Sequence, residues 1–170
     1  MNGAPLYQES REHWEVQPSL FISDTQSNRG YLLGLRETNK GFPMLAFDVG
    51  SGRRSIVRYI GRVYDATTPE KQWEVKSLHI KGDRITFGKT GSFLRLYDSE
   101  GQSTPYGIHA TSNIDTILSM PPHERYVSMG CILVSNELLS LLIDTYQFEE
   151  GALMVQTING VSQLGLSVPE

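Results

Sequence analysis

The chain has 170 residues, with 15 Lys and Arg against 19 Asp and Glu, a net charge of −4, and one cysteine. A chain of this length is typical of one domain that buries a substantial core. The single cysteine excludes an intramolecular disulfide and any site built from several cysteines. The acidic balance argues against a nucleic-acid-binding protein, which usually carries a basic excess. We therefore expect one compact, soluble domain.

The two ends of the chain differ from its middle. Residues 1–17 are polar, lack a regular periodicity and contain no apolar stretch typical of a signal peptide. The longest apolar run, Leu138–Ile143, is far too short to span a membrane. We interpret residues 1–17 as a polar leader, 18–160 as one domain and 161–170 as a C-terminal tail.

The first half of the domain is predicted to form short strands. Ser19–Asp24 and Arg29–Leu35 flank a polar turn. Gly41–Val49 is a third apolar run, and the turn signal Gly50–Gly52 closes it. Arg53–Tyr64 mixes apolar residues with arginines, and its pattern fits either a strand or a loop.

The second half adds further strands. Period-two alternation over Trp73–Ile80 predicts a half-buried strand, and we expect Arg84–Phe87 to pair back on it as a hairpin. Ser92–Tyr97 is predicted as a further strand, Thr104–Ala110 as a short segment and Ala152–Ile158 as a closing strand.

A long connection and one helix complete the pattern. Ala110–Val127 is predicted to be a long polar loop, of a kind that often forms a lid. Leucines then recur at helical spacing, with Ser135 as N-cap and Glu137 in the first turn, until Gly151 ends the helix. Eight or nine strands and one main helix make the chain mostly β, with a sandwich-like or barrel-like core.

Two short segments contain residues with the chemistry of a nucleophilic site. Cys131 is the lone cysteine, and a thiolate nucleophile needs a base such as His109, supplied from a neighbouring strand. Gly130 has no Cβ, so a substrate carbonyl can approach the backbone closely. Backbone N–H groups around the cysteine, at Met129 and Gly130, would then form an oxyanion hole.

A structural interpretation of the same residues stays open. A lone cysteine in a protein of this size is more often buried than reactive. His109 is one of four histidines, so a chance pairing with the cysteine is easy to obtain. Composition and spacing alone therefore leave both interpretations available.

A resemblance to a known family adds to this picture. The segments Tyr106–Thr111 (Y-G-I-H-A-T) and Ser128–Glu137 (S-M-G-C-I-L-V-S-N-E) resemble the L,D-transpeptidase catalytic domain of the YkuD type. In this resemblance Cys131 matches the nucleophile and His109 the base, 22 positions apart. Thr68–Pro69 is similar to the start of that family's T-P-x-G-x-[FY] strand.

The chain departs from the family pattern at three positions. Leu133 stands where an arginine that contacts substrate is common, Lys71 replaces the glycine of the T-P-x-G segment, and Ala110 replaces the glycine after the histidine. The resemblance implies a need to hold a peptide carboxylate, and we expect Arg125 to take over that role. Tyr106 and Ser128 are two further candidates for contact with substrate. For Tyr106 we favour the alternative of a structural aromatic in its strand, and Ser128 could instead orient the loop or form an ordinary turn.

The resemblance implies a fold and an activity for about residues 18–158. The fold would be a β-sandwich of mixed sheets with one main helix after the cysteine motif. The activity would be acyl transfer from a peptidoglycan tetrapeptide stem, through a thioacyl-enzyme that carbapenems also form, to give 3→3 crosslinks. Alternatives are an L,D-carboxypeptidase or amidase-type hydrolase on the same scaffold, and an inactive wall-binding module.

The resemblance also implies partners and a location. The substrate would be peptidoglycan stem peptides, with no nucleic acid, no integral membrane segment, no metal and no cofactor. The location would be the cell envelope, in the periplasm or cell wall.

Overall fold

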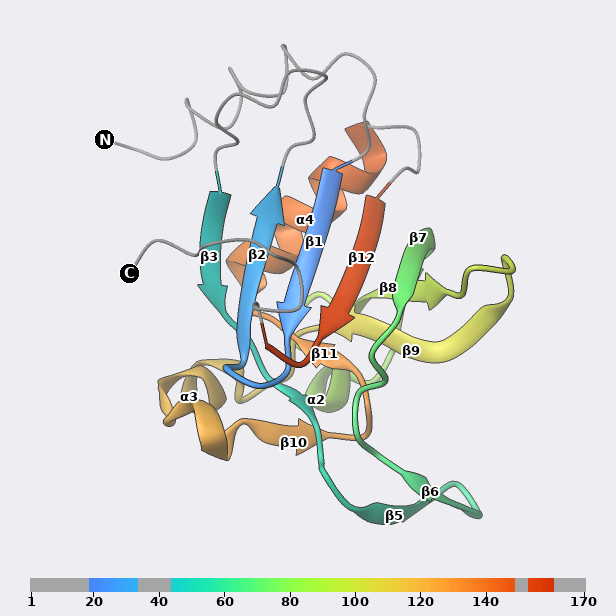
Figure 1. Cartoon of the computed structure of the whole chain (residues 1–170), viewed down its shortest axis with the longest axis vertical. Coiled ribbons are helices and arrows are strands. Elements are labelled where there is room, and N and C mark those ends of the chain that lie inside the picture. Colours follow the sequence, from blue (N-terminus) through green and yellow to red (C-terminus); the bar gives the residue numbers. More distant parts are fainter. Residues whose placement is uncertain (1–18, 34–43, 149–152, 161–170) are drawn as a thin grey trace.

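A computed structural model of the chain describes residues 19–33, 44–148 and 153–160 (Figure 1). The predicted leader, 1–17, and tail, 161–170, lie outside the described residues. No helix within the described ranges is both long enough and apolar enough to cross a membrane.

One eight-stranded mixed sheet, in the order β11-β9-β8-β7-β12-β1-β2-β3, forms the frame. Two pairs, β1 with β12 and β9 with β11, are parallel, and the other neighbours are antiparallel. The strands of this sheet are β1 (Ser19–Asp24), β2 (Arg29–Leu33), β3 (Met44–Asp48), β7 (Gln72–Ile80), β8 (Ser92–Tyr97), β9 (Ser103–His109), β11 (Ile132–Leu133) and β12 (Leu153–Ile158).

In the part of the chain that the structure describes, two small ladders and four helical segments lie around this sheet. β4 (Ser51–Gly52) pairs in parallel with β10 (Tyr126–Ser128), and β5 (Ile56–Tyr59) forms a hairpin with β6 (Arg62–Asp65). The helical segments are α2 (Arg84–Phe87), α3 (Ile114–Ser119), the 3-10 turn η1 (Pro122–Glu124) and α4 (Asn136–Phe148).

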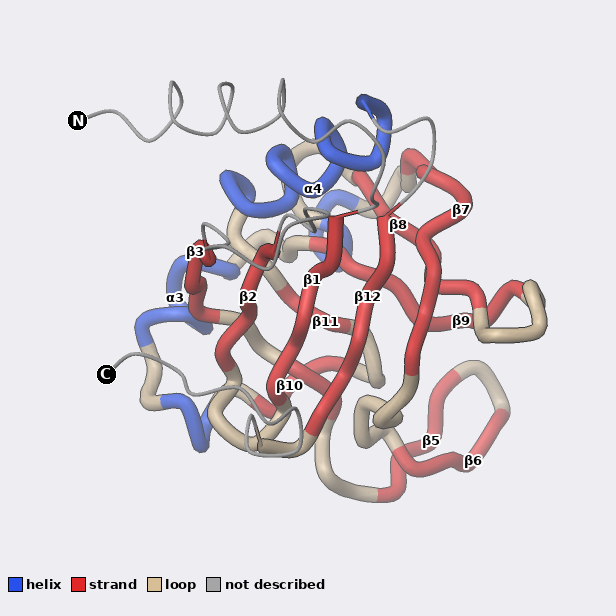
Figure 2. The backbone as a smooth tube through the Cα atoms, turned by 45° about the horizontal axis from the view of Figure 1, so that its top comes forward, coloured by secondary structure: helices blue, strands red, loops and turns tan. Residues whose placement is uncertain are grey.

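The helix α4 covers one face of the sheet and closes the core. Figure 2 shows it crossing above β1 and β2. Its buried leucines, Leu138, Leu139 and Leu142, share one apolar cluster with residues of the sheet such as Phe21 and Trp73. Burying one such side chain stabilises the fold by about 1.5–3 kcal/mol, so the leucine spacing fixes this helix against the sheet.

Much of the predicted architecture is confirmed. The chain is mostly β with one main helix after the cysteine motif. Strands lie over the predicted segments that begin at Ser19, Trp73 and Ser92. The Leu138 N–H donates to the Ser135 side chain at 3.1 Å, which confirms Ser135 as the helix cap.

The sequence predicts a strand over Arg84–Phe87, and this prediction is wrong. The segment forms the short helix α2, because the Asp83 carboxylate caps it by accepting hydrogen bonds from the N–H groups of Ile85 and Thr86, both at 3.0 Å. This helix lies beside the cysteine-bearing end of the sheet.

The Gly50–Gly52 segment is also not a simple turn. Ser51 and Gly52 form β4, which pairs with β10. A Cβ on Gly52 would lie 2.8 Å from the Gly130 Cα, so this glycine is needed for a close approach of two backbones.

Ala110–Val127 is not the long polar loop that the sequence predicted. It contains α3, η1 and the start of β10. Ile114 and Ile117 of α3 are buried in the main core, which anchors this segment to the domain. Arg53–Tyr64, which fitted either a strand or a loop, forms most of the β5–β6 hairpin that projects from the body of the molecule in Figure 1.

Candidate functional site

Cys131 and His109 lie on neighbouring strands. Cys131 directly precedes β11, and β11 pairs in parallel with the end of β9, with Ile132 opposite Ile108 and Leu133 opposite His109. Because side chains alternate along a strand, Cys131 projects to the same face as Leu133 and therefore as His109. The topology thus brings the predicted nucleophile and base to one face of the sheet.

The His109 ring is held in one orientation. Its Nδ1 lies 2.6 Å from the Ala110 carbonyl oxygen. A carbonyl can only accept a hydrogen bond, so Nδ1 carries the proton and Nε2 keeps its lone pair in the neutral ring. The rings of Phe87 and Phe93 pack against the imidazole, with centroids 4.9 and 5.7 Å away.

Burial keeps the imidazole neutral. It lowers the pKa of His109 below the ordinary value of 6.5, while the Ala110 and Thr86 carbonyls oppose this effect by stabilising the charged ring. His109 is 5% exposed, so the burial effect is strong. At neutral pH the ring is therefore neutral, with the proton on Nδ1 and the lone pair on Nε2.

The Cys131 thiol is neutral as well. The residue is only half-buried, yet its sulfur lies deep enough that burial raises the pKa to about 11. The Gly107 backbone N–H and the charges of Arg95 and Lys81 act in the opposite direction. Cys131 and His109 thus form a pair of neutral groups, and the thiolate has to be generated by proton transfer.

Arg95 belongs to the same face of the sheet and was not singled out by the sequence. It lies opposite Gly107 in the β8–β9 ladder, next to the strand end that faces Cys131. Its guanidinium lies 5.1 Å from the centroid of the Phe93 ring, and the Lys81 ammonium is equally near that ring. The charges of Arg95 and Lys81 also act on the Cys131 thiol.

A polar chain on β7 and β8 holds Arg95 in place. Its Nε donates to the His79 Nε2 at 3.4 Å, and its Nη1 donates to the Thr104 carbonyl at 2.7 Å. Ser77 connects the same His79 nitrogen, at 2.8 Å, with the Tyr97 hydroxyl, at 3.0 Å. Burial, Arg95 and Lys81 lower the pKa of His79, so its Nε2 can accept at neutral pH.

Ser128 shapes the loop that carries the cysteine. Its hydroxyl donates to the Cys131 carbonyl at 2.6 Å and accepts from the Gly130 N–H at 3.1 Å. The Gly130 amide, predicted as part of an oxyanion hole, therefore already has an acceptor in this structure. The Met129 carbonyl accepts from the Tyr64 hydroxyl at 3.0 Å. The oxyanion role of Met129 and Gly130 stays a prediction.

Thr68 holds this loop in place through two hydrogen bonds. Its hydroxyl donates to the Gly130 carbonyl and accepts from the Gly52 N–H, both at 2.8 Å. Thr68 is 3% exposed, so both bonds are shielded from water. The threonine of the T-P segment therefore fixes the turn before Cys131.

Tyr106 packs directly against that turn. Gly130 has φ +126°, and a Cβ there would lie 2.5 Å from the Tyr106 ring. The ring also meets Trp73 edge to face, with centroids 5.8 Å apart. Burial and then the Cys131 charge raise the pKa of Tyr106. Tyr106 thus lies beside the cysteine, and its contact with substrate stays a prediction.

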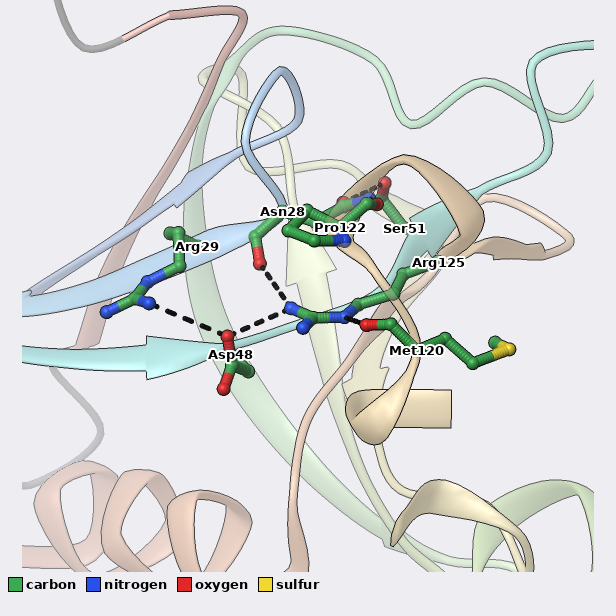
Figure 3. Close-up of polar contacts among 7 residues, drawn as sticks. All are labelled: Asn28, Arg29, Asp48, Ser51, Met120, Pro122 and Arg125. Atoms are coloured by element: carbon green, nitrogen blue, oxygen red, sulfur yellow. Dashed lines mark hydrogen bonds and ion pairs between the residues drawn. The ribbon is translucent and has the colours of Figure 1, made fainter. Parts of the chain in front are cut away.

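Arg125 has a different environment (Figure 3). It is buried, and its guanidinium donates to the Met120 carbonyl at 2.8 Å, to the Asp48 carboxylate at 2.9 Å and to the Asn28 carbonyl at 3.4 Å. These contacts tie the start of β10 to β3 and to the β1–β2 turn. They give Arg125 a structural task and do not support the predicted contact with a substrate carboxylate.

Solved structures with the same arrangement of strands come from bacterial proteins. An L,D-transpeptidase of Xylanimonas cellulosilytica matches with a TM-score of 0.54 and 21% identity over 84% of this chain. Bd1075 of Bdellovibrio bacteriovorus matches with a TM-score of 0.57 and 12% identity over 86% of this chain. The chain has the L,D-transpeptidase fold. The helical cell shape determining protein Pgp2 of Campylobacter jejuni is similar too, with a TM-score of 0.56 and 14% identity over 84% of the chain.

The matched proteins are longer than this chain. It spans 61% of the L,D-transpeptidase structure, 51% of Bd1075 and 48% of Pgp2. No protein-family model and no curated protein matches the sequence. The likeness at these identities concerns the L,D-transpeptidase fold, and the activity is argued below from the residues.

Proposed function

We propose that this chain is a cysteine-dependent L,D-transpeptidase that remodels peptidoglycan by acyl transfer from a tetrapeptide stem. One observation carries the proposal. The His109 Nδ1 donates to the Ala110 carbonyl, so its Nε2 is available as a base on the strand beside Cys131. The L,D-transpeptidase fold of the chain and its wall-related structural neighbours support the substrate class.

The first half-reaction forms a thioacyl-enzyme. His109 Nε2 takes the proton of the Cys131 thiol as the sulfur attacks the carbonyl carbon of the stem peptide. The C–N bond then breaks, and the imidazolium returns its proton to the departing amine of the terminal residue. Because thiol and imidazole both begin neutral, charge separation occurs only during attack.

The second half-reaction frees the enzyme. The side-chain amine of a second stem attacks the thioester while His109 accepts a proton from it, the C–S bond breaks, and the proton passes to the departing sulfur. The product is a 3→3 crosslink. Backbone N–H groups at Cys131, Met129 and Gly130 are proposed to stabilise the oxyanion in both steps, each by about 2.7–4 kcal/mol. The Gly130 amide would exchange its bond to Ser128 for this contact.

Arg95 is proposed to hold the substrate carboxylate. Leu133 is 2% exposed and apolar, and Arg125 is engaged elsewhere, so neither supplies a cation to the site. Arg95 acts on the Cys131 thiol electrostatically, and two of its guanidinium nitrogens are already fixed by His79 and Thr104. A preorganised guanidinium is suited to a carboxylate.

A hydrolase on the same scaffold is the second candidate. In that case water rather than a stem amine resolves the thioester, and the product is a shortened stem. The buried Leu133 at the position of the usual arginine favours this candidate, because an acceptor stem would then have fewer contacts. An inactive wall-binding module would leave both substrates unchanged. Each of the three places the protein in the cell envelope.

Product analysis by mass spectrometry separates these candidates. We expect the whole chain, incubated with disaccharide-tetrapeptides, to form 3→3 dimers and to release the terminal D-amino acid. Shortened monomers without dimers would assign the hydrolase, and unchanged substrate would assign the wall-binding module. Cys131→Ala and His109→Asn should abolish or strongly reduce turnover, whereas His123→Asn, at an exposed histidine, should not.

A further inference from the structure

The β5–β6 hairpin carries apolar side chains that the fold leaves uncovered. In Figures 1 and 2 it projects from the body of the molecule on the side away from α4. Ile56, Tyr59, Ile60 and Val63 are 66%, 46%, 81% and 61% exposed. Four exposed large apolar residues within one hairpin form a patch of the kind that marks an interaction site.

The backbone at the tip of the hairpin is strained, and the strained position is occupied by an apolar residue. Ile60 and Gly61 have φ of +48° and +72°, as in the type I′ turn that joins two-residue hairpins. Asn, Asp or Gly normally occupies the first of these positions, because a β-branched side chain is disfavoured at positive φ. Ile60 therefore costs stability and contacts little of its own chain, which points to a function outside the fold.

The hairpin is also strongly basic. Residues 53–65 contain four arginines and one acidic residue, Asp65, whose carboxylate accepts hydrogen bonds from Thr67, in a chain of net charge −4. Arg53 and Arg54 donate to carbonyls of the body, at Val127 and Thr25. The guanidinium groups of Arg58 and Arg62 are exposed and form no hydrogen bond or ion pair with any described residue. Two cations are thus free beside the apolar tip.

The two faces of the hairpin have different surroundings. Val57 lies opposite Tyr64, and the Tyr64 hydroxyl donates to the Met129 carbonyl, so this face adjoins the cysteine loop. Arg58 lies opposite Val63, and Ile56 lies opposite Asp65 at the base of the hairpin, so these four residues share the other face. Tyr59 and Arg62, the pair next to the tip, share the face of Val57 and Tyr64. The face of Arg58 and the tip carry free apolar groups together with a free cation.

We propose that this hairpin docks the protein on an anionic lipid bilayer. Ile60, with Ile56 and Val63, enters the boundary between head groups and acyl chains, and Arg58 and Arg62 bind lipid phosphates. A hydrated polyanion would satisfy the arginines but would leave the apolar tip in water. A bilayer surface accommodates both, and Tyr59 has the amphipathic ring typical of that interface.

Vesicle sedimentation of the whole chain tests this proposal. We expect binding to vesicles of equal parts phosphatidylcholine and phosphatidylglycerol, and little binding to phosphatidylcholine alone. The double variant R58Q/R62Q should weaken the partition coefficient about 30-fold. The variant Ile60→Asn should weaken it about tenfold, and it should fold at least as well because Asn suits the turn.

Matched controls make the result decisive. Ile85→Asn removes an exposed isoleucine from α2, and K76Q/K89Q removes two exposed positive charges elsewhere, so both should bind like the wild type. The proposal is overturned if the wild type does not sediment with the anionic vesicles, or if these controls lose as much binding as the hairpin variants. Binding to a soluble acidic polymer in the absence of vesicle binding would also overturn it. Acyl transfer plays no part in this assay.

Discussion

Cys131 and His109 favour their neutral forms for the same physical reason. Burial penalises whichever form is charged, so it raises the pKa of the thiol and lowers that of the imidazole. The pair therefore differs from a preformed thiolate–imidazolium ion pair. In the proposed mechanism the nucleophile is produced only when His109 Nε2 removes the thiol proton during attack, which would restrict its reactivity to a bound substrate.

The raised pKa of Cys131 predicts slow alkylation. With a pKa of about 11 in the fold against the ordinary 9.0, the thiolate fraction at pH 8 is about 100-fold lower than in the unfolded chain. Iodoacetamide should therefore modify the native protein about 100-fold more slowly than the urea-unfolded protein, and the native rate should keep rising between pH 8 and pH 11. Equal rates in both states at pH 8 would contradict the neutral thiol.

Arg95 is the residue whose substitution should separate substrate binding from stability. Arg95→Gln removes the cation, and we expect the KM for a stem peptide with a free terminal carboxylate to rise about tenfold. An amidated stem peptide should be much less affected, and Arg95→Lys should recover part of the loss. Steady-state kinetics with the two peptides measures this, and an equal KM increase for both would remove Arg95 from carboxylate binding.

Among the structural elements, the loop before β11 depends most on a single hydroxyl. Thr68 bonds both the Gly52 amide and the Gly130 carbonyl in a buried position. Thr68→Val keeps the shape and removes both bonds, which leaves two buried polar groups without partners. We expect a loss of about 2 kcal/mol or more in the free energy of unfolding by urea, together with slower acylation of Cys131.

Thr67→Val is the matched control for this prediction. The Thr67 hydroxyl bonds only the exposed Asp65 carboxylate, so its loss should change the unfolding free energy much less. If both variants lost the same stability and the same acylation rate, Thr68 would have no special role in fixing the cysteine loop.

Elements with a clear period could be predicted from the sequence, and short or non-periodic ones could not. Alternation marks β7, and leucine spacing marks α4. The helix α2 has only four residues, which carry no detectable period, so its sequence predicts a strand instead. A glycine in a sequence can mark either a turn or a close approach of two backbones, and Gly52 marks a close approach. A pattern within one segment cannot separate these cases.

Site residues were predictable where a motif marked them. Cys131 and His109 stand in the two segments that carry the family resemblance. Arg95 stands inside an ordinary strand, and its place near the thiol depends on the register of β7, β8 and β9, which no local pattern contains. Arg125 was chosen by its sequence distance from the cysteine, whereas the fold turns its guanidinium toward Asp48.

At the scale of the whole molecule, we expect Arg125 to contribute to the stability of the fold, although it lies in a connection between strands. Arg125→Ala removes a buried guanidinium that joins β10, β3 and the β1–β2 turn. It leaves the Met120 carbonyl without its donor, whereas the Asn28 carbonyl keeps the Val49 N–H. We expect a loss of about 2–3 kcal/mol in unfolding free energy, and a fall in Tm of about 2–4 °C per kcal/mol.

Arg29→Ala provides the control. Arg29 also pairs with Asp48, at 3.6 Å, but both side chains are nearly half exposed, so the pair should contribute less than about 1 kcal/mol. Thermal unfolding of the two variants measures the difference. An equal loss of Tm in both would show that the buried contacts of Arg125 do not hold these segments together.

The global arrangement of the sheet follows from contacts that are distant in sequence. Its parallel pairs join β1 to β12 and β9 to β11, so the first and last strands lie side by side. Composition and alternation predict a mostly β chain but do not define this order. The family resemblance anticipated the fold, and the match to solved structures at 12–21% identity supports it.

The central proposal is that Cys131 is the catalytic nucleophile of an L,D-transpeptidase. Intact-protein mass spectrometry after incubation with a carbapenem tests it most directly. The account predicts that the wild type gains the mass of one carbapenem molecule, located on Cys131 by peptide mapping, and that Cys131→Ala gains none. A wild-type protein that stays unmodified, although its thiol titrates freely once the chain is unfolded, would contradict the account.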